Sequence, residues 1–179
     1  VSYLYYADRV YQINLAIAGI AVGTVSLPVL SKAIKMKNYL RVSKIQNNSL
    51  QLSLLLSIPA SLGLIIASEE IINGLFGYGS FTLKDVELTS DALMFFGYGI
   101  IAFALVKVLT TFFFARDNTK TPFYVSSFIV LLNIIISVSL FNRFGFLIIP
   151  IATSFSTWVG VLIFIYLLKR NNILLIQKK

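Results

Sequence analysis

Five long stretches of mainly apolar residues follow one another along this sequence, separated by short polar segments. About 20 apolar residues are needed for a helix to cross the hydrocarbon core of a membrane. The pattern predicts an all-α integral membrane fold, a five-span transmembrane helical bundle. We expect its helices over about 2–33, 42–75, 83–115, 122–141 and 145–168.

The first predicted helix carries an acid and a base, Asp8 and Arg9, near its beginning. Charge is expensive inside a membrane helix unless it faces protein or water, so both residues are candidates for function. In a regular helix one stripe contains polar residues near the start and small residues below, with Gly19 and Gly23 forming a G-x-x-x-G pattern that allows close helix packing. We expect this stripe to face inward; its members are Arg9, Gln12, Ala16, Gly19, Gly23 and Ser26.

Further polar or helix-breaking residues interrupt the later apolar stretches. Pro59 in the second stretch predicts a bend that transport can use. Lys107 lies about 12 Å from the end of the third, which predicts that it faces a polar cavity or a partner. Phe112 to Phe114 resemble membrane-boundary aromatics, and Asn133 predicts a hydrogen bond between helices.

Composition removes several classes of chemistry. The chain has 179 residues, 58% of them hydrophobic and only 12% charged, which is typical of a membrane protein. It has neither Cys nor His, which excludes disulfides, thiol catalysis and His-ligated metals, and we expect no enzyme activity, no metal and no cofactor. Five acids between residues 69 and 91 are the one conceivable calcium site, but their spacing is not that of an EF-hand.

The net charge of +8 reflects topology rather than nucleic-acid binding, because the basic residues flank the apolar stretches. With five spans, eleven basic residues fall on one side of the membrane, against Lys84 and Arg143 on the other. The positive-inside rule then puts Val1 outside and Lys179 in the cytoplasm. The eleven are Lys32, Lys35, Lys37, Arg41, Lys44, Arg116, Lys120, Lys169, Arg170, Lys178 and Lys179. The chain begins with Val rather than Met, and we interpret it as an interior part of a longer protein.

Four motifs in order resemble the MurJ/MviN family of the multidrug/oligosaccharidyl-lipid/polysaccharide (MOP) exporter superfamily. They are SYLYYADR at 2–9, GIAVGTVSLPVLS at 19–31, FGYGSFT at 76–82 and FARDNTKTP at 114–122. The resemblance covers nearly the whole chain and implies a C-terminal-lobe fragment of a two-lobe transporter in the bacterial cytoplasmic (inner) membrane. The missing N-terminal lobe of the same chain and membrane lipids are then its partners. We expect that the fragment alone does not translocate lipid.

The resemblance implies a lipid II flippase for peptidoglycan biosynthesis, and so for cell wall biogenesis and cell shape. Such a protein moves undecaprenyl-diphosphate-linked disaccharide-pentapeptide from the inner to the outer leaflet by alternating access. Arg9 matches the family's cavity arginine, and a guanidinium fork suits a diphosphate. Asp8 matches a neighbouring acid that can close a gate, and Lys107 a family lysine that adds positive potential. Gln12 stands where the family often has an acid, and Asn14 where it often has a proline.

The loop motif around the fourth helix start is assigned to gating, together with Pro59. Its residues are Arg116, Asp117, Lys120 and Pro122, and Thr121 is expected to cap the helix that follows.

Three other functions remain open. Another MOP exporter is the nearest, either an O-antigen or polysaccharide-lipid flippase or a multidrug antiporter; an antiporter is expected to carry cation-binding acids within its spans, and here only Asp8 comes close. A membrane enzyme acting on a lipid-linked sugar needs clustered carboxylates, His or a metal site. A structural scaffold leaves Arg9 and Lys107 unexplained.

Overall fold

A computed structural model describes residues 2–79, 81–171 and 173, and these residues form helices and no strand. The all-helical fold class is therefore confirmed. The elements are α1 (Ser2–Leu15), the π-helical turn η1 (Ala16–Ala21), α2 (Val22–Lys35), α3 (Tyr39–Ile66), α4 (Ser68–Phe76), α5 (Leu83–Phe114), α6 (Lys120–Phe144), the 3-10 turn η2 (Gly145–Leu147) and α7 (Ile148–Arg170).

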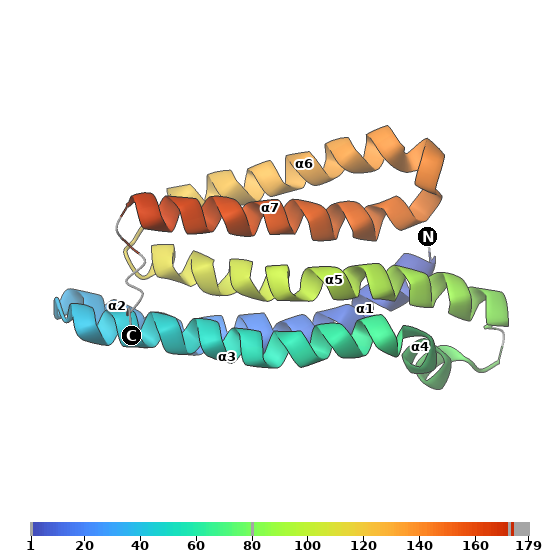
Figure 1. The fold of residues 1–179 in the computed structure, drawn as a ribbon, viewed down its shortest axis with the longest axis horizontal. Coiled ribbons are helices and arrows are strands. Elements are labelled where there is room, and N and C mark those ends of the chain that lie inside the picture. The colour runs from blue at the N-terminus through green and yellow to red at the C-terminus, as the bar shows by residue number, and fades with distance from the viewer. Residues whose placement is uncertain (1, 80, 172, 174–179) are drawn as a thin grey trace.

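Four helical segments of the described chain are long and apolar enough to cross a membrane. Three are single spans, Tyr3–Lys35, Tyr39–Ile66 and Leu83–Phe114. The fourth, Lys120–Arg170, contains both α6 and α7, which reverse direction at Gly145 and pack side by side (Figure 1). Where the sequence indicated one helix over 42–75, the structure has two, α3 and α4, separated at Ala67.

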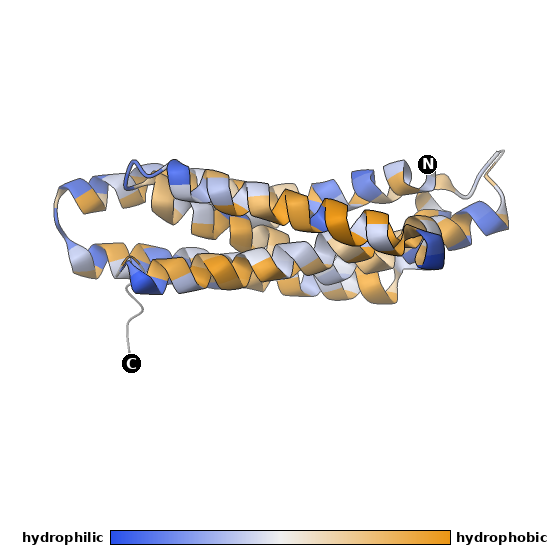
Figure 2. Ribbon diagram, turned by 90° about the horizontal axis from the view of Figure 1, so that it is seen from above, coloured by the Kyte–Doolittle hydropathy of each residue, from blue (hydrophilic) through white to orange (hydrophobic). Residues whose placement is uncertain are grey.

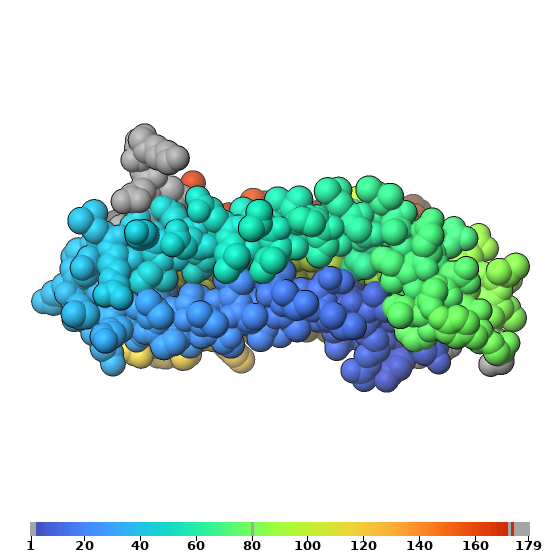
Figure 3. All heavy atoms as spheres, turned by 90° about the horizontal axis from the view of Figure 1, so that it is seen from below, coloured from blue at the N-terminus to red at the C-terminus, as the bar shows by residue number. Residues whose placement is uncertain are grey.

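The helix α5 lies at the centre of the bundle (Figure 1). It packs against α1, α2, α3 and α4 on one side and against α7 on the other. On the face seen in Figure 3, α1 and α2 run beside α3 along most of the length of the molecule. By contrast α6 packs chiefly against α7, and only Pro122 and Val125 of it are buried. Since α6 hardly touches α5, space remains between α6 and the rest of the bundle.

Hydrophilic residues gather towards the two ends of the bundle (Figure 2). The α2–α3 turn, the α5–α6 loop and the end of α7 all lie at one end, which we call the basic end (Figure 1). It holds nine of the eleven basic residues that the sequence assigned to one side, because Lys178 and Lys179, like Val1, are outside the described residues.

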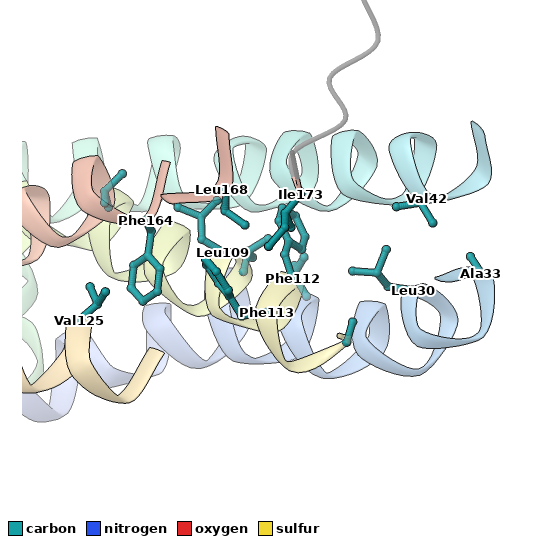
Figure 4. Close-up of a cluster of buried hydrophobic side chains, with 14 of the residues drawn as sticks. Leu30, Ala33, Val42, Leu109, Phe112, Phe113, Val125, Phe164, Leu168 and Ile173 are labelled. Atoms are coloured by element: carbon teal, nitrogen blue, oxygen red, sulfur yellow. The ribbon is translucent and has the colours of Figure 1, made fainter. Parts of the chain in front are cut away.

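The larger hydrophobic core lies near the basic end, where α2, α3, α5 and α7 meet (Figure 4). Phe112 and Phe113 are fully buried in it, and Phe113 packs against Phe164 of α7 with ring centroids 5.8 Å apart. The interpretation of these phenylalanines as membrane-boundary aromatics was wrong for both, whereas Phe114 is exposed. A run of three identical aromatics gave no sign that two of them are buried in the core and one is not.

Hydroxyl groups join the helices where their backbones approach closely. On α3, Ser53 donates a hydrogen bond to the carbonyl of Ala18 (3.0 Å) and Ser61 one to the carbonyl of Gly97 (2.8 Å). The predicted interhelical bond of Asn133 is confirmed, since its Nδ2 donates to Thr153 Oγ1 on α7 at 2.7 Å. Such bonds and small side chains are what hold helices together where water does not drive association.

The turn η1 interrupts the first predicted helix. A π turn holds one residue more than an α-helical turn, so it rotates the residues on its two sides relative to each other. Gly19, Gly23 and Ser26 are buried, whereas Arg9, Gln12 and Ala16 are exposed. The predicted single inward-facing stripe was therefore wrong, because its spacing assumed an unbroken α-helix.

The glycines in and after the π turn allow the closest helix contact. A Cβ added at Gly19 would lie 3.1 Å from the backbone Cα of Ala104, and one at Gly23 would lie 3.1 Å from Thr111 Cγ2. We expect Gly19→Leu to lower the free energy of unfolding by about 1–3 kcal/mol, the usual cost of overpacking. Thermal unfolding of the detergent-solubilised protein measures this change. The matched control is Gly63→Leu on α3, where an added Cβ meets nothing within 4 Å; equal losses from both variants would contradict the close contact at Gly19.

Candidate functional site

Four polar residues of α1 form a cluster on one side of this helix, away from the basic end. Arg9 Nη2 donates to Tyr5 Oη at 3.1 Å, and the guanidinium carbon lies 4.8 Å from the centre of the Tyr5 ring. Gln12 Nε2 donates to Asp8 Oδ2. Both pairs are four residues apart, the spacing at which side chains of one helix meet. Tyr5 was not predicted, although its position four residues before Arg9 is a readable signal.

Arg9 is exposed on the surface of this bundle. A guanidinium has five N–H donors, and only one of these has a hydrogen-bond partner within the described part of the chain. The pairing with Tyr5 directs the guanidinium towards the start of α1, because Tyr5 lies one turn earlier. Arg9 therefore presents a cation, with N–H donors that no other described residue uses, on the outer surface of the bundle.

The structure places Lys107 apart from Arg9, on α5 at the level of Gly19 and Gly23. It lines a groove of about 1020 Å³ between α2, α5 and α6, and its side chain is exposed. Most of the groove's lining is apolar, so a polar cavity or a partner for Lys107 stays a prediction. Lys120 and Pro122 line the same groove, and Arg9 does not. Gly19 follows Arg9 by ten residues, which puts Arg9 and Lys107 at levels about 15 Å apart along the bundle.

The loop between α5 and α6 is a compact helix stop and restart. Asp117 has a positive φ of 56° and the amides of Asp117 and Asn118 return to the carbonyls of Phe114 and Phe113, which is the Schellman arrangement. Asn118 then bonds Thr121 twice, through Oδ1 to the amide and through Nδ2 to the hydroxyl. The expectation that Thr121 caps α6 was wrong, because α6 begins at Lys120 and Thr121 lies inside it, with its amide donating to Asn118 Oδ1.

Arg116 fastens this loop to the chain that follows α7. Its Nη1 donates to the Phe112 carbonyl at 3.0 Å and its Nη2 to the Ile173 carbonyl at 3.1 Å. The buried Gln46 of α3 donates to the same Ile173 carbonyl at 3.0 Å. Burial lowers the pKa of the Arg116 guanidinium, but arginine keeps its proton in proteins, so the contact stays charged. No signal in the sequence points to Gln46, because its partner is a backbone atom 127 positions away.

The remaining predicted residues are spread over the molecule. Pro59 is exposed within α3, which continues as one helix from Tyr39 to Ile66. Asp85 and Thr82 form a capping box at the start of α5, and their three-residue spacing is the one typical of such a box. No three acidic side chains of the described residues are close enough together to hold a metal ion.

Comparisons with known proteins agree on one family. The sequence matches the family described as "Lipid II flippase MurJ" over residues 1–179. The probable lipid II flippase MurJ of Rickettsia prowazekii (strain Madrid E) is 37% identical over 174 residues, which cover 97% of this chain and 34% of the relative. The corresponding protein of Rhizobium tropici is 34% identical, again over 97% of this chain and 33% of the relative.

A solved structure is similar throughout the bundle. It is described as "Lipid II flippase MurJ, inward closed conformation", and it matches with a TM-score of 0.87 and 30% sequence identity, over 97% of this chain and 37% of that one. The chain thus spans about a third of the length of the relatives it matches.

The Arg116 contacts predict a measurable effect on the chain after α7. The Ile173 amide donates to the Leu168 carbonyl at 2.9 Å, so its exchange with solvent hydrogen reports whether this segment stays in place. Arg116→Met keeps the side-chain length and removes the donors. We expect it to speed the exchange by about tenfold or more, since a hydrogen bond to a charged group contributes about 1.5–3 kcal/mol.

Arg170→Met is the matched control, because Arg170 is exposed at the end of α7 and lies closer in sequence to Ile173. Hydrogen–deuterium exchange with mass spectrometry compares the two variants. Unchanged exchange in Arg116→Met would show that Gln46 alone holds the segment.

Proposed function

This chain belongs to the lipid II flippase MurJ family, and from this premise we propose that it forms part of a transporter for lipid-linked peptidoglycan precursor. In this proposal the complete protein moves undecaprenyl-diphosphate-linked disaccharide-pentapeptide from the inner to the outer leaflet by alternating access. The family match over the whole chain carries the proposal, and the similarity to a solved MurJ bundle supports it.

Arg9 is the residue that we assign to the diphosphate. It is exposed and keeps donors unused within the described residues, while Tyr5 holds its guanidinium in one direction. A planar fork with paired N–H groups matches two phosphate oxygens at once, which a lysine ammonium does not. The surface on which Arg9 lies would then face a chamber shared with the N-terminal lobe.

Asp8 and Gln12 are assigned to the same chamber. The hydrogen bond from Gln12 holds the carboxylate of Asp8, which is the residue before Arg9 in the sequence. A carboxylate so placed can pair with a basic group of the other lobe and hold a gate closed until substrate competes for the cations. Lys107 adds positive potential at a different level, in the groove near the basic end.

The loop between α5 and α6 is assigned to gating at the basic end, through Arg116, Asp117, Lys120 and Pro122. Its hydrogen bonds to α5 and to the chain after α7 support movement of this end as one unit. Pro59 is assigned to bending of α3, in which it removes one backbone hydrogen bond.

We place the protein in the bacterial cytoplasmic (inner) membrane with the basic end in the cytoplasm. The nine described basic residues of that end support this orientation through the positive-inside rule. The start of the chain would then be periplasmic and its end cytoplasmic.

Substitution of Arg9 tests the proposed activity. In cells depleted of their own lipid II flippase, the complete protein with Arg9→Ala is expected to fail to support growth, because the diphosphate loses its paired donors. Arg9→Lys is expected to restore growth only in part, since it keeps the charge and loses the fork, and Lys107→Ala to slow growth. Arg143→Ala is the matched control and should grow normally; Arg143 lies in the last turn of α6, at the end of the helix away from the basic end. Normal growth with Arg9→Ala would count against the diphosphate role.

Asp117 separates a backbone role from a side-chain role in the loop. Its positive φ is a conformation that glycine adopts without strain, and relief of this strain is worth about 1–2 kcal/mol. Glycine gives back about 0.4–1 kcal/mol through its greater freedom in the unfolded chain, so Asp117→Gly is expected to raise the free energy of unfolding by about 1 kcal/mol or less. If the carboxylate itself takes part in gating, Asp117→Gly should also slow growth in the same complementation. Stable protein with normal growth would limit Asp117 to stopping α5.

A further inference from the structure

The turn between α2 and α3 is the part of the basic end that reaches furthest out. It extends beyond the α5–α6 loop and the end of α7 (Figure 1). Within it Met36, Tyr39 and Leu40 are 63%, 68% and 76% exposed. Single exposed apolar residues are ordinary, but several together, rimmed by polar groups, mark an interaction surface. We call residues 35–41 the tip.

The tip has a fixed shape. Lys37 has a positive φ of 52°, and its amide donates to the Ile34 carbonyl at 2.9 Å. The next amide, that of Asn38, donates to the Ala33 carbonyl at 3.1 Å, which completes a Schellman arrangement at the end of α2. Asn38 Oδ1 then accepts a hydrogen bond from the Arg41 amide at 3.0 Å and caps α3. Because the turn is ordered beforehand, a partner that binds it spends little free energy on ordering it.

The charge of the tip is positive, and few acids lie near it. Three basic residues, Lys35, Lys37 and Arg41, are exposed within it. Of the seven acids of the chain, only Asp117 lies at the basic end, in the α5–α6 loop. Charge complementarity therefore favours a negatively charged partner.

Depth relative to the membrane decides which kind of anion can cover the tip. About 20 helical residues cross the hydrocarbon core, so a core that begins at Ile66 of α3 ends at about Asn47. Tyr39 lies eight residues further, about 12 Å at 1.5 Å per residue. The headgroup layer beyond the core is only about 5–7 Å thick. Lipid phosphates can thus reach Lys44, three residues beyond Asn47, whereas Tyr39 and the neighbouring Leu40 lie in water.

We propose that the tip is a docking site for a separate water-soluble protein whose surface carries carboxylates around an apolar patch. Tyr39 and Leu40 pack on the apolar patch, and tyrosine is enriched at such interfaces. Lys35 and Arg41 pair with the carboxylates at its rim. The orientation given under the proposed function makes this partner cytoplasmic; the docking itself does not rest on that function.

Photo-crosslinking in living cells tests the tip in the complete protein. The photoreactive p-benzoylphenylalanine replaces Tyr39, and mass spectrometry identifies what it attaches to after irradiation. We expect an adduct with a separate water-soluble protein, at a peptide in which Asp or Glu stands next to apolar residues. Adding Lys35→Glu/Arg41→Glu is expected to reduce this adduct by about fivefold or more, because like charges then face each other. Leu40→Gln removes apolar surface without changing a charge and should also reduce it.

Lys169→Glu/Arg170→Glu is the matched control, because it makes the same change of charge at the same end, on α7 and outside the tip. It should leave the adduct unchanged. An adduct with phospholipid alone, an adduct only with another part of the same polypeptide, or no adduct at all would each overturn the proposal. An adduct that Lys35→Glu/Arg41→Glu leaves unchanged would overturn it too. Growth of Arg9→Ala cells has no bearing on these results, so the docking proposal and the proposed function fail separately.

Discussion

Close approach of helix backbones around α5 is the constraint on which this bundle depends. Helices surrounded by lipid gain little from burying apolar surface against each other, so contact distance and hydrogen bonds decide their association. Gly19 and Gly23 bring the first span against α5, and Ser53 and Ser61 bond carbonyls of neighbouring helices. With one wall fixed in this way and α6 held by α7, the groove beside α5 stays open.

The same packing separates the two cations to which function is assigned. Arg9 belongs to the half of the first span before the π turn, and Lys107 meets the π turn itself and the start of the half that follows it. A transporter that moves a charged headgroup through a membrane needs favourable contacts at more than one depth, since a single strong site would only hold its cargo. Arg9 and Lys107 lie at two such depths on this bundle.

Much of this architecture could be predicted from the sequence, because apolar length and basic flanks follow from the membrane alone. The α5 capping box and the Asn133 contact were also accessible, since each depends on a residue type with few alternatives in its position. The orientation of Arg9 was not, because a π turn has no residue signature and changes the phase of everything before it. The Arg116–Ile173 contact was equally hidden, as any residue can supply a carbonyl.

The π turn in the first span has a consequence for how such a helix changes during evolution. A regular α-helix turns by about 100° for each residue, so one residue inserted or deleted between Ala16 and Ala21 would rotate Arg9 and Asp8 around the helix by about that angle. Gly19 and the helix beyond it would keep their place against α5. Length variation at a single point can therefore redirect the polar side chains of this lobe while every one of them stays the same.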